Sequence, residues 1–321
     1  IWLMTLLTIV DESLRALLGE MLLPQVGKVF TATDVGEIQR ILIERESPSI
    51  VLFDLNRHAE LVEICREGRQ EKIGFPLYML ALVSDDQLGD FMFMEGIDDY
   101  LRIPVCEYEL GVRLRVATRI LDLEMDLTDT QKELRYTACH DPMTGLLNHN
   151  EIIDVLQRRL DLPETRGHSV SIVMMDLDSF KHTNDTYGHL SGDNVLCQTS
   201  QKLLDLTRPV DSVGRYGGDE FLIVLNNCNS EDAFQLAERI RTAVEEDLPA
   251  VLDDEVNITV SVGIATACQE DSNALDLIGK ADTALYEAKK DGGNKVRVAE
   301  EKPSANLELV GEGENAGRFT D

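Results

Sequence analysis

The sequence predicts an α/β protein of two domains joined by a long helix, and three observations carry this prediction. The 321 residues are too many for one compact core and suit two. Short apolar runs alternate with amphipathic stretches over residues 1–108, which is typical of a parallel sheet with helices on both faces. A charged segment with apolar residues at 4-3 spacing then leads into a second series of strands and helices.

The first domain, residues 1–108, is expected to be a doubly wound parallel sheet. Amphipathic stretches at Ser13–Leu23 and Val35–Glu46 are predicted as helices. In such sheets functional groups gather at the carboxyl ends of the strands, where this chain places Asp11, Glu12, Asp54 and Ser84. The predicted strands are Leu6–Val10, Lys28–Thr31, Ile50–Asp54, Leu77–Val83 and Asp99–Arg102.

Residues 109–138 form the predicted helical linker. Two sets of residues recur every seven positions and together make a 4-3 apolar seam, which is typical of a two-stranded coiled coil. The alternative is an ordinary amphipathic helix packed on its own domain, and we favour the coiled coil because a charged helix between two domains has little else to pack on. The seam consists of Val116, Leu123 and Thr130 with Ile120, Leu127 and Leu134.

The second domain is expected at residues 139–299, and the acidic residues 300–321 are predicted to be a disordered tail because few of them are apolar. Strands are predicted at Ser169–Met175, Ser212–Arg215, Glu220–Leu225, Asn257–Ala265 and Lys295–Val298. Helices are predicted at Glu151–Leu160, Asp193–Leu206, Glu231–Glu246 and Asn273–Lys290.

Composition excludes several classes of protein. With 59 acidic and 30 basic residues the net charge is −29, which argues against a nucleic-acid partner because phosphate contact needs a basic face. The most apolar stretch, Ile1–Val10, is about half the ~20 residues that span a membrane and lacks the features of a signal peptide. Six scattered cysteines without a Cys-x-x-Cys pair indicate a reducing compartment. We therefore expect a soluble cytoplasmic protein without a membrane partner.

Carboxylates end two of the predicted strands of the second domain. The strand Ser169–Met175 runs into Asp176-Leu177-Asp178, and one of these two aspartates is expected to face a metal. Alone, such a strand end is more often a turn or a helix cap. Gly217-Gly218 predicts a two-residue hairpin with positive φ, followed by Asp219 and Glu220. Two carboxylate-bearing strand ends suit a magnesium–triphosphate site, and the chain has no P-loop motif.

Five motifs over residues 137–299 resemble the GGDEF family in order and spacing. The resemblance implies a nucleotide-cyclase-like α/β fold with an antiparallel centre and diguanylate cyclase activity, in which two GTP condense to cyclic di-GMP and two pyrophosphates. The motifs are Asp141-Pro142-Met143-Thr144-Gly145-Leu146-Leu147-Asn148, Asp176-x-Asp178-x-Phe180-Lys181-x-x-Asn184-Asp185, Gly188-His189-x-x-Gly192-Asp193, Arg215-Tyr216-Gly217-Gly218-Asp219-Glu220-Phe221 and Asp282-x-Ala284-Leu285-Tyr286-x-Ala288-Lys289.

The resemblance also implies roles for individual residues. Asp219 and Glu220 would be the catalytic acids, and with Asp176 and the main-chain oxygen of Leu177 they would hold Mg²⁺, with Mn²⁺ as the alternative metal. Asn184 and Asp193 would read guanine, because a carboxylate accepts hydrogen bonds from guanine that adenine cannot donate. The remaining substrate-binding residues implied are Phe180, Lys181, His189 and the phosphate-binding Lys289.

Two positions depart from the family pattern. Gly293 and His149 stand where the family has arginine, and the loss of a phosphate contact at Gly293 predicts weaker GTP binding rather than lost activity.

A product-inhibition site is implied by Arg208-x-x-Asp211, with Arg239 as its secondary arginine. Taken alone, this spacing would indicate a surface ion pair, but arginine stacks on guanine and hydrogen-bonds its edges. The same residues define the alternative function, a non-catalytic effector that senses cyclic di-GMP. The intact acids and guanine pair argue against that alternative, because a pure sensor needs none of them.

Residues 3–120 resemble a response-regulator receiver. Asp54 matches the phospho-acceptor, Asp11 and Glu12 the metal-binding acids, and Ser84 the switch hydroxyl, whereas Ile103 replaces the usual lysine. The resemblance implies a sensor histidine kinase as partner and a homodimer as the active unit. The alternative is a pseudo-receiver kept for dimerisation, and we place phosphorylation at Asp54 slightly ahead of it.

Overall fold

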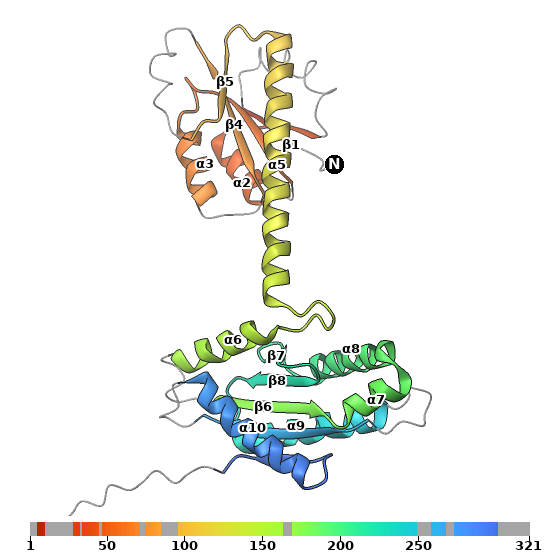
Figure 1. Ribbon diagram of the computed structural model, residues 1–321. Coiled ribbons are helices and arrows are strands. Elements are labelled where there is room, and N and C mark those ends of the chain that lie inside the picture. Colours follow the sequence, from red (N-terminus) through yellow and green to blue (C-terminus); the bar gives the residue numbers. More distant parts are fainter. Residues whose placement is uncertain are drawn as a thin grey trace, which may run out of the picture. The chain divides into compact units, whose positions relative to one another are not determined.

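The computed structural model describes residues 5–9, 28–32, 34–44, 47–70, 75–84, 96–162, 169–248, 258–267 and 273–300. The chain divides into two compact units, residues 1–135 and 136–321, and each is described by itself (Figure 1).

The first unit contains a five-stranded sheet in the order β2-β1-β3-β4-β5. Every pair of neighbouring strands is parallel. This is the parallel sheet that the alternation of strands and helices predicted. The strands are β1 (Thr5–Ile9), β2 (Lys28–Thr31), β3 (Ser49–Asp54), β4 (Leu77–Val83) and β5 (Asp99–Arg102).

Helices cover both faces of this sheet. Alternate residues of β3 and β4, such as Leu52 and Leu80, pack against α5 (Glu107–Cys139). Their neighbours, such as Phe53 and Met79, pack against α2 (Val35–Glu44) and α3 (Glu60–Gln70). Helix α3 was not predicted, because its apolar residues are confined to Leu61–Cys65 and its second half is charged and polar. The helix expected at Ser13–Leu23 lies outside the described residues.

Helix α5 has two apolar stripes. One stripe, formed by Leu110, Leu114, Ala117 and Leu121, is buried in the core of the first unit. The helix therefore packs on its own domain, as the alternative reading held, yet the predicted seam stays outside that contact. The apolar residues of the seam are exposed to 44% for Val116, 37% for Ile120, 58% for Leu123, 59% for Leu127 and 64% for Leu134.

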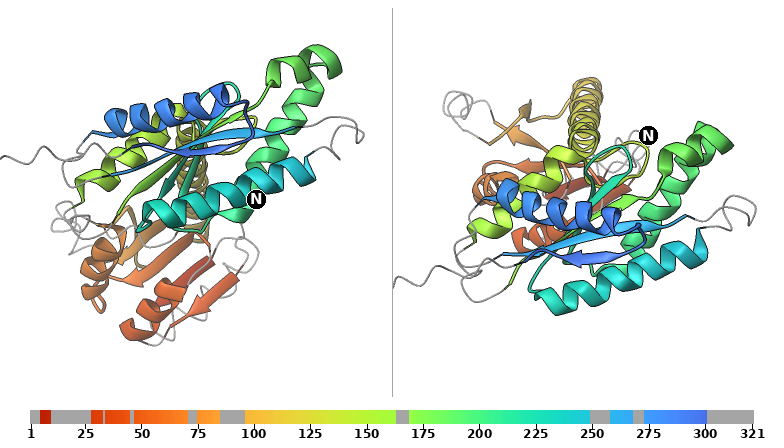
Figure 2. Two further views of the ribbon diagram at one scale, coloured as in Figure 1. Left: turned by 90° about the horizontal axis from the view of Figure 1, so that it is seen from below. Right: turned by 60° about the horizontal axis from the view of Figure 1, so that its bottom comes forward.

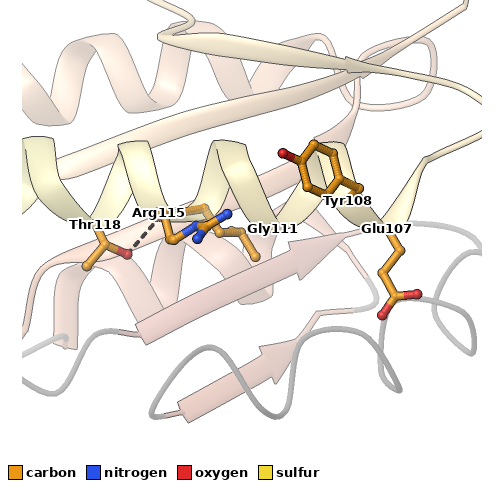
Figure 3. Close-up of a pocket in the computed structure, with 6 residues that line it drawn as sticks. Glu107, Tyr108, Gly111, Arg115 and Thr118 are labelled. Atoms are coloured by element: carbon orange, nitrogen blue, oxygen red, sulfur yellow. Dashed lines mark hydrogen bonds between the residues drawn. The ribbon is translucent and has the colours of Figure 1, made fainter.

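A hollow of about 600 Å³ follows another flank of α5 (Figure 3). None of the predicted site residues lines it. Its described lining consists of Glu107, Tyr108, Gly111, Leu114, Arg115 and Thr118.

The second unit contains a sheet in the order β10-β9-β6-β8-β7. The central strand β6 (Ser171–Leu177) is antiparallel to both β8 (Glu220–Leu225) and β9 (Val260–Thr266). The edges are β7 (Ser212–Arg215), antiparallel to β8, and β10 (Val296–Val298), parallel to β9. The antiparallel centre is the one that the family resemblance implied.

Helices lie on both faces of this second sheet (Figure 2). One face, with Val173 and Ile223, packs against α8 (His189–Leu206) and α9 (Ser230–Asp247). The other face, with Ile172 and Leu222, packs against α6 (His149–Asp161) and α10 (Ala274–Lys290).

A short helix that was not predicted, α7 (Phe180–Tyr187), follows β6 directly. Gly188, with a φ of 86°, separates it from α8, which begins four residues earlier than expected. A φ of this sign favours glycine, so the chain can turn sharply there.

In the described part of the chain, no helix combines the length and apolarity that a membrane span requires. Residues 301–321, which include nearly all of the predicted disordered tail, lie outside the described residues.

Candidate active site

Three acidic residues meet where β6 ends. Asp176 and Glu220 are partners across the antiparallel ladder of β6 and β8. Asp219 lies next to them, and its carbonyl oxygen accepts a hydrogen bond from the Leu177 amide (3.2 Å). Asp176 is buried, and its Oδ2 lies 2.7 Å from Nζ of Lys289 on α10. The structure thus brings five of the predicted site residues together around one strand end.

This arrangement makes Asp176 hard to ionise. Burial is the main cause that raises its pKa to about 6, and the negative charges of Asp219 and Glu220 act in the same direction. The hydrogen bond and charge of Lys289 oppose the shift without cancelling it. A buried carboxylate beside two further acids provides a strong local preference for a cation.

The second aspartate of the pair, Asp178, faces elsewhere. It accepts hydrogen bonds from the hydroxyls of Thr259 (2.7 Å) and Ser261 (2.6 Å) and from the amide of Asn294 (2.9 Å). Asp178 therefore ties β6 to β9 and to the turn after α10. Only Asp176 points toward the other acids, because β6 ends at Leu177 and Asp178 lies in the turn that follows, where it is held by β9.

The predicted two-residue hairpin with positive φ at both glycines is wrong. Four residues, Tyr216–Asp219, connect β7 to β8, and neither Gly217 nor Gly218 has a positive φ. A Cβ at Gly217 would clash with Oε2 of Glu220, so another residue there would force this carboxylate to move. At Gly218 a Cβ would meet open space.

Two residues that had no predicted role brace this loop. The guanidinium of Arg215 bonds the carboxylate of Asp141 and the carbonyl oxygen of Gly218. His149, the second departure from the family pattern, donates from Nδ1 to the carbonyl oxygen of Tyr216 (2.7 Å) and contacts its ring. The contacts of Arg215 with Asp141 and of His149 with Tyr216 join positions 74 and 67 residues apart, so no spacing pattern could have indicated them.

The acids suit a hard cation that also binds phosphate. Within the described residues, no group of three or more His, Cys, Asp or Glu side chains is arranged to hold a metal ion without further ligands. Magnesium commonly binds through one or two carboxylates and completes its shell with water and substrate phosphates. Asp176 and Asp219 fit this pattern, in which substrate oxygens supply the remaining ligands.

The predicted guanine pair lies on α7 and α8. The side chain of Asn184 covers Gly192, where a Cβ would clash with its Oδ1, and Asp193 is the next residue. Phe180 packs against the core, whereas Lys181 and His189 are exposed. The fold therefore brings Asn184 beside Asp193 at the end of the sheet that β6 runs into (Figure 1).

Gly293, the first departure from the family pattern, lies in the turn after α10. Its φ is 73°, and a Cβ there would lie 3.2 Å from the carboxylate of Asp178. Arg241 supports this turn through Asn294, since its Nη1 donates to Asn294 Oδ1 (2.9 Å).

The predicted inhibitory residues line a separate hollow of about 190 Å³ between α8 and α9. Asp211 accepts hydrogen bonds from the amides of Arg208 (3.2 Å) and Asn226 (3.1 Å), which fix its carboxylate. Arg239 donates to the carbonyl oxygen of Leu206 (3.2 Å). Burial raises the pKa of the Cys228 thiol at the same hollow, and Asp232 and Asp211 add to the effect. The structure thus brings the three predicted residues together.

In the first unit, Asp54 ends β3 with its side chain 8% exposed. The Asn56 amide donates to its Oδ1 (3.0 Å), and Arg57 Nε lies 3.6 Å from its Oδ2. Ser84 accepts a hydrogen bond from the Asn56 side chain (3.4 Å). Ile103 packs against the core, while the adjacent Arg102 is exposed. The predicted acids Asp11 and Glu12 lie outside the described residues.

Residues 138–295 match the family model described as "Diguanylate cyclase, GGDEF domain". These residues belong to the GGDEF family. Two curated relatives are Diguanylate cyclase A of Treponema denticola, 36% identical over 73% of this chain, and Response regulator PleD of Caulobacter vibrioides, 32% identical over 71% of this chain. The chain spans 58% and 51% of the lengths of these two relatives.

Among solved structures, the GGDEF chain resembles the coiled coil and GGDEF domain of DgcB from Caulobacter crescentus, determined in complex with c-di-GMP. The TM-score is 0.53 at 28% sequence identity, and the match covers 59% of this chain and all of the DgcB chain.

Proposed function

We propose that this GGDEF protein is a diguanylate cyclase that condenses two GTP into cyclic di-GMP and two pyrophosphates. The observation that carries the proposal is the meeting of Asp176, Asp219 and Glu220 at the end of β6, with Asn184 beside Asp193 on the helices that follow. Relatives and a solved neighbour whose names include diguanylate cyclase and c-di-GMP support it.

Each residue then has a definite task. Asp176, the main-chain oxygen of Leu177, Asp219 and Glu220 would hold the divalent ion. When bound, Mg²⁺, or Mn²⁺ as the alternative, polarises the α-phosphate and stabilises its developing charge. Asp219 or Glu220 takes the proton of the attacking 3′-hydroxyl.

The substrate is positioned by the residues around the acids. Asn184 and Asp193 select guanine, and Phe180, Lys181 and His189 border the same nucleotide. Lys289, whose side chain is 41% exposed beside Asp176, binds phosphate. Because Gly293 offers no cation, GTP binds more weakly than in relatives with arginine there.

Each catalytic unit holds one GTP, so a homodimer is the active unit. The exposed seam of α5 supports pairing through this helix, because a parallel coiled coil would bury Ile120, Leu123 and Leu127. In that register Arg119 of one copy lies beside Glu124 of the other, a favourable charge pair.

Two inputs regulate the enzyme. Cyclic di-GMP binds at Arg208, Asp211 and Arg239 and inhibits from a surface away from the acids. The first unit acts as a receiver that a sensor histidine kinase phosphorylates on Asp54. Since Ile103 cannot pair with a phosphoryl group, we expect substantial basal activity.

The test is to incubate the purified chain with GTP and MgCl₂, with MnCl₂ in parallel, and to separate the nucleotides. We expect cyclic di-GMP and pyrophosphate from the wild type and neither from Asp219→Ala at unchanged melting temperature. The alternative, a non-catalytic sensor, predicts no product at any protein concentration together with binding of added cyclic di-GMP. That result would overturn the cyclase proposal.

A further inference from the structure

A hollow of about 260 Å³ lies beside the acids, between α10 and the start of β8. Glu220 and Lys289, which line it, already have proposed roles. Asp282 and Tyr286 line it as well and belong to the α10 motif, but the mechanism above uses neither. The described lining is completed by Thr283 and Leu285.

The geometry of α10 arranges these residues in a row. Asp282, Tyr286 and Lys289 are spaced i, i+4 and i+7, so they share one face of the helix over about 10 Å. Lys289 ends the row at Asp176. Asp282 ends it near Tyr216, whose pKa is raised by burial and by the negative charges of Glu220 and Asp282. The row therefore runs along the catalytic loop.

The polar groups of Asp282 and Tyr286 do not stabilise the fold through contacts with other described residues. The carboxylate of Asp282 and the hydroxyl of Tyr286 make no hydrogen bond or ion pair there, and Tyr286 is 66% exposed. By contrast, Ala281 and Leu285 on the same helix are buried in the core. The two polar side chains are thus available to a ligand.

The alternation of side chains along β8 shows which face of the sheet Glu220 points to, and so which ligand can reach this row. Leu222 and Val224 of β8 pack on the face of the sheet that α6 and α10 cover, so Glu220 points to that face as well. The guanine pair lies on α7 and α8, and α8 covers the opposite face. A GTP whose base lies at Asn184 and Asp193 therefore reaches the acids and Lys289 with its phosphates only, which leaves the end of the row at Asp282 and Tyr286 to a second nucleotide.

The chemistry of the row favours the sugar over the phosphates of that second nucleotide. Two carboxylates, Glu220 and Asp282, border the hollow against one cation, Lys289. Because Lys289 binds a phosphate of the copy's own GTP, the charge that remains repels a second phosphate. They readily accept hydrogen bonds from hydroxyl groups. The ring of Tyr286 offers an apolar face against which a sugar can pack.

We propose that this hollow receives the ribose of the GTP held by the other copy, with Asp282 accepting from its hydroxyls and Tyr286 packing against the ring. This inference rests on the proposed cyclase function. It makes Asp282 and Tyr286 catalytic positioning residues that present the attacking 3′-hydroxyl to the acids. They contribute nothing to the binding of a copy's own GTP.

The test compares the condensation rate with binding of a GTP analogue that has a methylene group between its α and β phosphorus atoms. Asp282→Asn should lower kcat roughly tenfold or more, since it weakens a charge-assisted hydrogen bond, while analogue affinity and melting temperature stay unchanged. Tyr286→Ala should act likewise, and Tyr286→Phe should keep most of the activity because the ring remains. Asp276→Asn, an exposed charge on the same helix away from the hollow, is the matched control.

The outcomes distinguish failure of the ribose site from failure of the cyclase proposal. If Asp282→Asn weakens analogue binding by the factor by which it lowers kcat, the hollow serves the copy's own GTP and the assignment is wrong. Wild-type kcat in both Asp282→Asn and Tyr286→Ala also overturns it, with the cyclase proposal intact. A wild type that forms no cyclic di-GMP overturns the cyclase proposal, and this inference with it.

Discussion

Arg215 and Asp141 are 74 residues apart in sequence, yet Arg215 Nη1 lies 3.1 Å from Oδ1 and 3.3 Å from Oδ2 of Asp141. The same guanidinium donates from Nη2 to the carbonyl oxygen of Gly218 (2.7 Å). Burial disfavours the charge on Asp141, but hydrogen bonds from Thr144 and the Arg215 charge outweigh it and lower the pKa of this carboxyl. The loop that carries Asp219 is thus held in place by the segment before α6.

Replacing Arg215 tests whether its hydrogen bonds hold the Tyr216–Asp219 loop in the active conformation. We expect Arg215→Ala to lower the unfolding free energy by about 1.5–3 kcal/mol and to reduce cyclase activity further than that loss of stability explains. Initial rates and urea denaturation would measure the two effects. Arg158→Ala, which removes an exposed pair with Glu151, is the control and should change neither. Wild-type activity in Arg215→Ala would contradict the bracing role.

Replacing Asp176 and Asp178 by asparagine should change the free energy of unfolding in opposite directions. The pKa of Asp176 is raised from its usual 3.8 to about 6 in the native state. Between pH 3.8 and pH 6 the native state therefore binds more protons than the unfolded state. Stability from this group is therefore lost as the pH rises through that range. Asp176→Asn should abolish activity, yet raise the unfolding free energy at pH 8 by about 2–3 kcal/mol in metal-free buffer.

Asp178→Asn is the matched comparison for that measurement. It weakens three hydrogen bonds and should destabilise the protein at pH 8 by about 1–3 kcal/mol. The gain from Asp176→Asn should shrink toward pH 5, as urea denaturation at both pH values would show. A loss of stability in Asp176→Asn at pH 8 would contradict the cause assigned to its pKa.

Asp193→Ser tests the guanine assignment. The hydroxyl cannot accept two hydrogen bonds from the guanine edge as a carboxylate does, so the preference for GTP over ATP should fall roughly tenfold or more. Competition of the two nucleotides, measured as kcat/KM for each, checks this. Asp185→Ser, an exposed acid on α7, should leave the preference unchanged. Unaltered discrimination in Asp193→Ser would remove this residue from the base site.

Gly263 sets how closely α10 approaches the sheet. A Cβ there would clash with the carbonyl oxygen of Ala281 and the amide nitrogen of Leu285. Gly263→Ala should therefore push α10 from β9 and cost about 1–3 kcal/mol. Gly279→Ala on α10, where a Cβ meets open space, should stabilise by up to about 1 kcal/mol. Thermal melts of both variants test the pair, and equal effects would contradict the close contact.

Arg208→Ala tests product control. Losing one guanidinium from a charge-assisted contact should cost about 1.5–3 kcal/mol, roughly a ten- to hundredfold loss of product affinity. We expect this variant to accumulate more cyclic di-GMP at unchanged KM for GTP, measured in full progress curves. Arg297→Ala, which removes an exposed pair with Asp291, is the control. Progress curves that still stall at the wild-type product concentration would place inhibition elsewhere.

Local apolar patterns predicted most of the fold. The strands at Leu77–Val83 and Glu220–Leu225 begin and end where the structure has them, because polar or glycine-rich turns bound each apolar run. β6 ends at Leu177, two residues later than predicted, since Asp176 is a polar residue inside the ladder. Helix α7 was missed because its sequence, from Phe180 to Tyr187, has no apolar stripe.

The site was predicted less completely than the fold. Motif spacing identified Asp176 and the acids of the loop, and the structure brings them together. It could not indicate that Arg215 meets Asp141 or that Asp178 meets Ser261, because these contacts depend on tertiary packing. The roles of the metal, guanine and product residues remain predictions.

The exposed seam of α5 also bears on how much of this protein a cell makes. If two copies must pair along Leu123 and Leu127 before the bond can form, output per molecule rises with concentration instead of staying constant. Self-repulsion between chains of net charge −29 weakens the pairing at low ionic strength and keeps isolated copies apart. Expression level and ionic strength then act as inputs in their own right, alongside any phosphoryl group or bound product.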